Sequence, residues 1–284
     1  MTSLDQFESA FKRADKPVFH YAPVQVARVV VLSDGDAEAT AEDAEQFKRY
    51  FTGLGGTQES APEWSSISGA DYGSGPELLE LLSERNPDLI ITYRLLKERT
   101  RDLPYSLGTY LDHLSQATRA PLLVMPRDGR ELDTSVKQVM AMTAHMTGDE
   151  RIVNWAARFL PVEGGQLYLT HIEDDYVFER YMGVIGKVSS LDTETARTDI
   201  LAQLLREPSD YIERCREAFA AAGCKAELFG IVKLGHRIQQ YAELVREHGV
   251  DLLVLEGKDE SQSAMSGVSY SLAVELRSTP VLIL

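Results

Sequence analysis

Residues 78–93 read LLELLSERNPDLIITY, and residues 241–256 read YAELVREHGVDLLVLE, with the same apolar pattern along their whole length. Each stretch predicts an amphipathic helix that runs directly into a short strand. The strand segments, DLII at 88–91 and DLLV at 251–254, are uninterrupted apolar runs after their first residue, which is typical of parallel strands buried on both faces. The chain is therefore predicted to be a degenerate repeat built on parallel strands.

The repeat continues downstream of both stretches. Residues 108–124 (GTYLDHLSQATRAPLLV) and 267–283 (GVSYSLAVELRSTPVLI) align without a gap, so their leading glycines and their prolines coincide. The remaining predicted elements are opening strands at 28–32 and 139–143, helices after them at 39–51 and 149–159, and, in the second half, strands at 166–171 and 225–230 and a helix at 236–248. This alternation predicts an α/β protein of two tandem doubly wound parallel-sheet domains.

The two halves differ in length, which sets the expected domain bounds. Between its first helix and Asp88 the first half has one strand candidate, at 64–67, so it is predicted to be abbreviated by one strand-helix unit. We expect a first domain at 26–126, a polar linker rich in turn formers, and a second domain at 136–284. Residues 1–25 are predicted to form an appended helix, at 4–13, and an extended arm.

Composition excludes several classes of protein. The 284 residues include 29 Lys plus Arg and 44 Asp plus Glu, a formal charge of −15. Such a surface repels phosphate backbones and anionic membranes, so we expect no nucleic-acid or membrane partner. No apolar run reaches the roughly 20 residues that span a bilayer, and the first residues are too polar for a secretory signal, which predicts a cytoplasmic protein. The two cysteines, Cys215 and Cys224, lack metal-binding spacing and are predicted to be structural thiols.

Two tandem copies that each close on a DLIVV-like strand, a glycine helix start and a proline before an apolar strand resemble the universal stress protein (UspA-like) family. The best local matches are DLLVLEG at 251–257, NWAARF at 154–159 and the two closing helix-strand units. The resemblance implies a Rossmann-like fold in each copy, with strand order 3-2-1-4-5. It also implies ATP or AMP as the ligand, bound by an Asp after the first strand and by a Gly-x2-Gly-x9-Gly-Ser/Thr signature after the fourth.

The first half keeps part of that signature. Asp34 follows the first strand, and Gly108 and Thr109 stand at the expected helix start, but the two leading glycines are missing from the loop at 92–104. We expect Asp34, Gly108 and Thr109 to form a residual anion or nucleotide site. The basic side chains of the loop either bind an anion themselves or form a solvated basic loop, which we favour; they are Arg94, Lys97, Arg99 and Arg101.

The second half keeps Gly257 and Gly267 of the signature but is degenerate in other ways. Val268 stands where the hydroxyl belongs, and the intervening loop carries Asp259 and Glu260, whose charges oppose phosphate. The expected Asp after the first strand aligns with Ala144. Conventional ATP binding is therefore not expected in this half.

Three histidines are predicted at strand ends of the second half. His145 follows its first strand, His171 ends the second, and His236 follows the third. If these strands are neighbours, two imidazoles and a carboxylate would converge at the carboxyl edge and bind a Zn²⁺-like ion. An open coordination position would support hydrolysis, whereas four protein ligands would make the site structural. The alternative, which we favour, is polar strand ends and helix caps.

Two further segments bear on partners. The stretch 173–210 inserts some twenty residues rich in large apolar side chains, which predicts a lid over the crevice or a partner-binding helix. The closing strands, 122–125 and 281–284, are apolar edges that need a partner. The resemblance implies that the two copies pair through them within one chain. A further homodimer is also expected.

Three functions follow, in order of preference. The first is a non-enzymatic, stress-associated binding or regulatory protein with degenerate nucleotide sites and no catalytic residues. The second is a Zn-like metal module at the histidine edge, hydrolytic if the metal keeps an open position. The third is a protein interaction scaffold whose sites are vestigial. Walker A, HExxH, G-x-S-x-G and Rossmann GxGxxG motifs are all lacking from the sequence, which argues against the common enzyme classes.

Overall fold

In the computed structural model the described residues are 19–54, 61–98, 105–127, 135–143, 150–161, 164–188, 192–257, 265 and 267–284, so the expected helix at 4–13 lies outside them. The strands are β1 (Arg28–Leu32), β2 (Glu63–Ile67), β3 (Leu89–Tyr93), β4 (Leu122–Met125), β5 (Gln138–Met142), β6 (Gln166–Asp174), β7 (Glu227–Gly235), β8 (Leu252–Leu255) and β9 (Val281–Ile283). The helices are α2 (Ala37–Tyr50), α3 (Gly75–Arg85), α4 (Thr109–Ala117), α5 (Glu150–Arg158), α6 (Asp175–Ile185), α7 (Thr193–Ala221), α8 (Arg237–Glu247) and α9 (Gly267–Glu275), with a short 3-10 turn, η1 (Thr52–Leu54). No helix in these ranges combines the length and the apolar character needed to cross a membrane.

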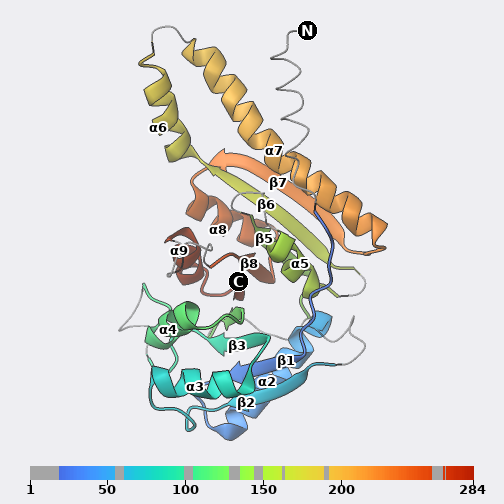
Figure 1. The fold of residues 1–284 in the computed structure, drawn as a ribbon, viewed down its shortest axis with the longest axis vertical. Helices are drawn as coiled ribbons and strands as arrows, with labels where there is room; N and C mark the ends of the chain where they lie inside the picture. Colours follow the sequence, from blue (N-terminus) through green and yellow to red (C-terminus); the bar gives the residue numbers. More distant parts are fainter. Residues whose placement is uncertain are drawn as a thin grey trace.

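The nine strands of the described residues form one continuous sheet, in the order β2-β1-β3-β4-β9-β8-β5-β6-β7 (Figure 1). Neighbouring strands are parallel except β4 and β9, which are antiparallel, with Leu122 opposite Ile283 and Val124 opposite Val281. The closing strands of the two copies therefore pair with each other, as expected, and neither is left as an open edge. The predicted fold of two tandem doubly wound parallel units is confirmed, although the two units share a single sheet.

The two halves differ as the sequence predicts. Five strands of the second half follow the order 3-2-1-4-5, as β7-β6-β5-β8-β9. In the described part of the first half the sheet ends at β2, with no strand beyond it. The prediction from the sequence ended two strands too early. β6 and β7 pair continuously to Asp174 and Gly235, beyond the expected ends at His171 and Gly230. The hydrogen bonds between the two strands continue through Glu173 and Asp174, which follow the apolar residues of β6.

The sheet separates two apolar layers because successive strand residues point to opposite faces. One layer contains Val29, Val31, Leu123, Val254 and Leu282. The other contains their neighbours in the same strands, Val30, Leu32, Leu122, Val124, Leu253, Leu255, Val281 and Ile283. Both layers cross the β4–β9 junction without interruption, so hydrophobic burial holds the two copies together.

Local capping explains where the helices of the first half begin and end. The side chain of Asp36 accepts a hydrogen bond from the Ala39 N–H at 2.9 Å and starts α2. Ser74 starts α3 in the same way, with Pro76 in the first turn, and Asn86 ends α3 in the left-handed conformation. These caps direct the chain back into β3 and fix the position of the loop that follows it.

An N-terminal arm crosses the second half before β1 begins (Figure 1). Phe19 is buried and stacks on Phe219 of α7 with ring centroids 5.7 Å apart. The Asn154 side chain of α5 accepts from the Ala22 N–H at 3.1 Å and donates to the His20 carbonyl at 3.2 Å. The beginning of the chain is therefore packed on the second copy, which ties the two halves together at a second place.

The insertion after β6 forms a projecting helical hairpin rather than a lid. α6 follows β6 directly, contacts mainly β6, β7 and α7, and extends away from the sheet together with the first part of α7 (Figure 1). Pro208 marks a boundary in α7, because the buried residues of that helix all lie from Pro208 onward. Cys215 is buried there and Cys224 is partly buried, and neither of these two cysteines is in a disulfide.

Candidate functional site

The predicted first-half site lies at the carboxyl ends of β1 and β3. These strands are neighbours, and β2 pairs with the opposite side of β1, so the chain changes direction across the sheet at this point. Ligands of open α/β sheets bind at such switch points. Asp34 follows β1, and Gly108 and Thr109 begin α4, so all three predicted residues lie on this edge of the sheet.

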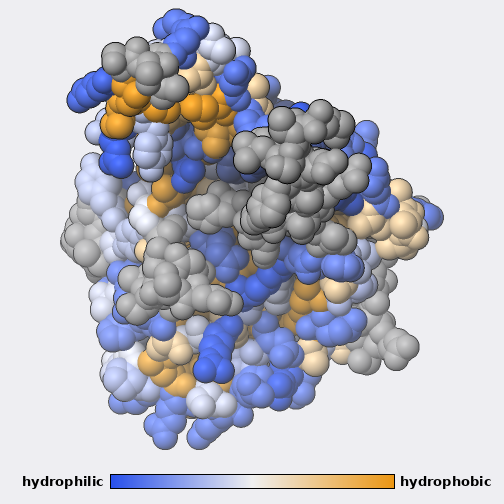
Figure 2. All heavy atoms as spheres, turned by 45° about the horizontal axis from the view of Figure 1, so that its top comes forward, coloured by the Kyte–Doolittle hydropathy of each residue, from blue (hydrophilic) through white to orange (hydrophobic). Residues whose placement is uncertain are grey.

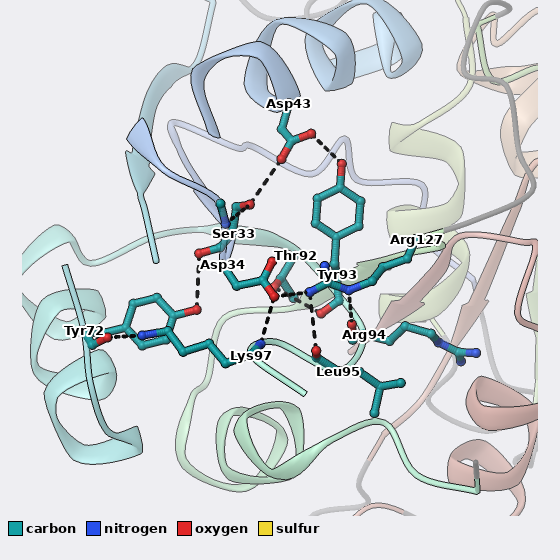
Figure 3. A network of polar contacts seen from close by, with 11 residues as sticks. Ser33, Asp34, Asp43, Tyr72, Thr92, Tyr93, Arg94, Leu95, Lys97 and Arg127 are labelled. Atoms are coloured by element: carbon teal, nitrogen blue, oxygen red, sulfur yellow. Dashed lines mark hydrogen bonds and ion pairs between the residues drawn. The ribbon is translucent and has the colours of Figure 1, made fainter. Parts of the chain in front are cut away.

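Asp34 is engaged by the chain itself (Figure 3). Its carboxylate accepts a hydrogen bond from Arg127 Nη2 at 2.7 Å and from the backbone N–H of Lys97 at 2.9 Å. The Arg127 guanidinium lies 5.6 Å from the centre of the Tyr93 ring and also donates to the Arg94 carbonyl at 2.9 Å. Arg127, which follows β4, therefore closes over the carboxylate that would contact a nucleotide.

The ionisation of Asp34 reflects these contacts. Burial alone would raise its pKa, but the hydrogen bonds from Arg127 and from the Lys97 N–H outweigh burial, so the pKa of Asp34 lies below its ordinary value. The carboxylate is consequently charged and neutralised by its own arginine. A ligand that needs this carboxylate as a free acceptor would have to displace Arg127.

A second hydrogen-bonded group supports the loop behind Asp34. Tyr93 donates its hydroxyl to Asp43 of α2 at 2.6 Å, and Ser33 donates to the same carboxylate at 3.2 Å. Burial, followed by the bond to Asp43, raises the pKa of Tyr93. Tyr72 donates to the Ser33 carbonyl at 3.2 Å, and its ring lies 4.0 Å from Lys97 Nζ. These polar groups are therefore held in place by their contacts with one another.

The start of α4, where phosphate would bind, is capped by a carboxylate of the same chain. Glu98 accepts the backbone N–H of Thr109 at 2.9 Å and its hydroxyl at 2.6 Å. Gly108 has φ +103°, and a Cβ added there would meet Glu98 Oε2 at 2.5 Å and Leu95 Cα at 2.9 Å. The N-terminus of a helix stabilises the negative charge of a side-chain carboxylate just as it stabilises that of a bound phosphate. The glycine is required by this close approach of the preceding loop.

The loop after β3 contains two non-glycine residues in the left-handed backbone conformation. Leu95 and Lys97 have φ values of 57° and 59°, the left-handed region that costs non-glycine residues roughly 1–2 kcal/mol each. The resemblance places glycines in this loop, and the loop retains two left-handed residues although the glycines are gone. Arg127, Asp34 and the Leu95–Leu107 backbone contact hold it in place.

Backbone donors of this site are already paired. The N–H of Leu95 donates to the Leu107 carbonyl, that of Lys97 to Asp34, that of Glu98 to the Leu95 carbonyl, that of Gly108 to Ser106 Oγ, and that of Thr109 to Glu98. A phosphate-binding loop works by presenting free N–H groups to the ligand. These five donors are not available to one in this structure.

Arg94 has a role that its sequence position does not suggest. Its side chain is 8% exposed and donates to the carbonyls of Ala273 and Val274, at the C-terminal end of α9 in the other half. Burial, with Arg277 nearby, lowers its pKa to about 10, and it remains a cation at the negative end of the helix dipole. The interpretation of this loop as a solvated basic loop is therefore wrong for Arg94. Arg99 and Arg101 lie outside the described residues.

In the second half, Gly257 and Gly267 occupy the places that the repeat predicts. Gly257 follows β8, and Gly267 is the first residue of α9. A Cβ on Gly257 would lie 2.6 Å from Ile283 Cγ2, and its N–H donates to the Leu284 carbonyl at 3.0 Å. Packing against β9 is a sufficient reason for this glycine. Ala144, Asp259 and Glu260 lie outside the described residues.

The predicted metal ligands are not brought together where they are described. His171 is buried, with Nδ1 3.2 Å from the Thr143 carbonyl and Nε2 3.2 Å from the Glu173 carboxylate. His236 is exposed and begins α8. Because β6 runs three residues beyond His171, about 10 Å of strand separates that histidine from the sheet edge. His145 lies outside the described residues, and the described ones contain no group of three or more His, Cys, Asp or Glu side chains that could hold a metal.

Two residues that close the first-half site were not identified from the sequence. Glu98 lies eleven positions before Thr109, in a loop that belongs to no repeat motif, and Arg127 lies within the polar stretch predicted as a linker. Their signal was an acidic residue in a basic loop and an arginine directly after a buried strand. Neither position predicts its partner without the fold.

The fold and the edge site together define a tandem doubly wound α/β protein with one copy closed by its own side chains. Solved universal stress proteins have this fold. A proposed universal stress protein from Pseudomonas aeruginosa UCBPP-PA14 matches with a TM-score of 0.53 and 11% identity over 91% of this chain and 93% of that one. A universal stress protein from Archaeoglobus fulgidus matches with a TM-score of 0.50 and 12% identity over 91% and 85%.

A functionally unknown protein from Pseudomonas aeruginosa PAO1 is similar in the same way, with a TM-score of 0.52 and 10% identity over 91% of this chain and 92% of that one. No protein-family model and no curated protein matches the sequence. The predicted resemblance is thereby confirmed in its structural content: the chain has the tandem universal stress protein fold.

Proposed function

We propose that this chain is a non-enzymatic regulatory protein of the stress-protein type that acts through protein contacts, and that its first half does not take a nucleotide. The observation that carries the proposal is the pairing of Glu98 with Thr109 at the start of α4. In that contact the negative charge of the Glu98 carboxylate lies where the phosphate of a nucleotide would be expected.

Electrostatics oppose a second anion at this place. A phosphate oxygen brought to about 4 Å from Glu98 would be repelled by roughly 1–4 kcal/mol per unit charge at effective dielectric constants between those of water and a protein surface. Displacing Glu98 instead would sacrifice both of its hydrogen bonds. Asp34, the other expected contact, is neutralised by Arg127, which adds the cost of breaking that pair.

No specific observation favours the hydrolytic metal module. His171 is already held by Thr143 and Glu173, and His236 lies at a different level of the sheet. The internal pairing of Thr109 and Asp34 supports recognition through the protein surface rather than through a ligand at this edge.

Calorimetric titration with ATP and with AMP tests the proposal. We expect any heat of binding to be the same in the wild type, in Asp34→Asn and in Thr109→Val, because neither residue contacts a ligand. Gly267→Ala, at the equivalent helix start of the second half, is the matched comparison. Saturable binding that weakens tenfold or more in both first-half variants, but not in Gly267→Ala, would contradict the proposal.

A further inference from the structure

The helical hairpin after β6 is a firmly built unit. Arg197 of α7 donates to both carboxylate oxygens of Glu179 on α6, at 2.7 and 2.5 Å, and its guanidinium lies 5.4 Å from the centre of the Phe178 ring. Phe178 and Met182 are almost fully buried. One face of α6 is therefore used to hold the hairpin together.

A neighbouring face of α6 is apolar and exposed. Among the described residues six large apolar side chains are exposed, and five of them lie between 176 and 188. Val177, Tyr181, Val184 and Val188 are 37%, 55%, 59% and 45% exposed. Hydrophobic residues gather at the projecting end of the hairpin, bordered by hydrophilic ones (Figure 2). Exposed apolar residues concentrated in one segment mark a contact surface.

The spacing of these four residues selects the shape of the partner. They lie at i, i+4, i+7 and i+11, the alternating pattern of the seam along which one helix packs on another. Val188 lies three residues beyond the end of α6, so Val177, Tyr181 and Val184 form the helical part of the seam and Val188 adds an exposed apolar side chain after it. A helix in the partner is the element that fits a seam of this period.

Charge selects the chemistry of the partner. At about 100° per residue, Arg180 lies beside the seam on α6 and over the Tyr181 ring, and Lys187 follows in the turn after the helix. Asp175 and Glu179 point to the other side of α6, where Glu179 is paired with Arg197. The seam is thus bordered by two cations in a chain whose net charge is −15.

We propose that this outer face of α6, made of Val177, Arg180, Tyr181, Val184, Lys187 and Val188, binds an amphipathic helix of another protein whose apolar seam is flanked by acidic residues. Opposite charges beside an apolar seam set partner choice and orientation. A second copy of this chain would bring the cations of two identical faces together. An anionic membrane would gain only about 1 kcal/mol from each of two cations, against the repulsion of the acidic body.

The test uses two synthetic probes. Both are labelled peptides of three heptads with leucine at a and d; one has glutamate at e and g, and the other has lysine there. Fluorescence anisotropy with the full chain should show saturable binding of the glutamate peptide and at least tenfold weaker binding of the lysine peptide. Val184→Asp should weaken the glutamate peptide at least tenfold, whereas Tyr105→Asp, at an exposed tyrosine outside the hairpin, should leave its affinity unchanged.

Charge reversal supplies the second arm. In Arg180→Glu/Lys187→Glu the preference should reverse toward the lysine peptide, and circular dichroism should show the wild-type melting temperature. The proposal is overturned if the glutamate peptide does not bind, if both peptides bind equally, or if Val184→Asp binds like the wild type. It is also overturned if Val184→Asp abolishes a dimer in sedimentation velocity or binding to vesicles of phosphatidylserine, since the face would then belong to a second copy or to lipid.

Discussion

Glu98 holds Thr109 by two hydrogen bonds, from the backbone N–H at 2.9 Å and from the hydroxyl at 2.6 Å, and so places a carboxylate at the first turn of α4. The resemblance noted in the sequence led us to expect a phosphate at this helix start. The carboxylate comes from the loop after β3, the same loop whose glycines are missing. The loop that lacks the glycines expected from the resemblance thus makes an internal contact with the start of α4 through Glu98.

Replacing Glu98 should destabilise the protein. Glu98→Ala removes the cap of α4 and should lower the free energy of unfolding by about 1–2 kcal/mol, measured by urea unfolding at neutral pH. Glu98→Gln keeps an acceptor oxygen and should lose less. Glu80→Ala, an exposed glutamate on α3, should change stability by less than about 0.5 kcal/mol. Equal losses in Glu98→Ala and Glu80→Ala would show that the cap does not matter.

Asp34 should contribute stability that depends on pH. Its pKa in the folded state lies below the ordinary value of 3.8, because the bonds from Arg127 and Lys97 outweigh burial. A group of this kind stabilises the fold fully above its unfolded pKa, and the stability is lost as the pH falls through its folded pKa. Asp34→Asn should therefore cost about 1–2 kcal/mol at pH 7 and progressively less below about pH 4. A difference from wild type that is constant between pH 7 and pH 3 would be the contrary result.

Gly108 should be intolerant of a side chain for reasons of packing. Gly108→Ala combines a positive φ with a Cβ 2.5 Å from Glu98 Oε2, and we expect a loss of about 1–3 kcal/mol. Gly183→Ala is the matched control, because nothing lies within 4 Å of a Cβ on that glycine of α6. That substitution should stabilise the helix by roughly 0.5–1 kcal/mol. Chemical denaturation of both variants measures the contrast, and opposite signs are expected.

Arg94 should connect the two halves. Arg94→Met keeps the apolar stem but removes the guanidinium that bonds the last carbonyls of α9, so stability should fall by about 1–3 kcal/mol. Hydrogen exchange should accelerate in α9 although the substitution lies after β3. Arg119→Met, an exposed arginine of the first half, should leave exchange in α9 unchanged. Faster exchange confined to the β3 loop would mean that Arg94 acts only locally.

Much of the fold was predictable from the sequence because buried parallel strands are uninterrupted apolar runs. The runs at 88–91 and 251–254 located β3 and β8, and the gap-free alignment of 108–124 with 267–283 located α4, α9 and the closing strands. The pairing of those closing strands was expected from their need for a partner, whereas its antiparallel direction was not predicted. The ends of β6 and β7 were misplaced because pairing between the two strands continues where the apolar pattern stops.

The site was less predictable because it depends on contacts between distant segments. Asp34, Gly108 and Thr109 were assigned to one edge correctly, since strand ends and helix starts follow from the repeat. Their partners were not, because Arg127 lies 93 residues from Asp34 and Arg94 lies 179 residues from Ala273. A charged residue outside a repeat motif has no periodicity that indicates which carboxylate or helix end it will meet.

Hydrogen-exchange mass spectrometry of the wild-type chain, with and without millimolar ATP, tests the closed first-half site most directly. Exchange is measured peptide by peptide, so ATP bound elsewhere on the chain can be distinguished from ATP bound at the start of α4. Because Glu98 and Arg127 already satisfy Thr109 and Asp34, exchange in residues 105–117 should be the same with and without ATP. Slower exchange at the start of α4 in the presence of ATP would contradict the closed site and show that a nucleotide displaces Glu98.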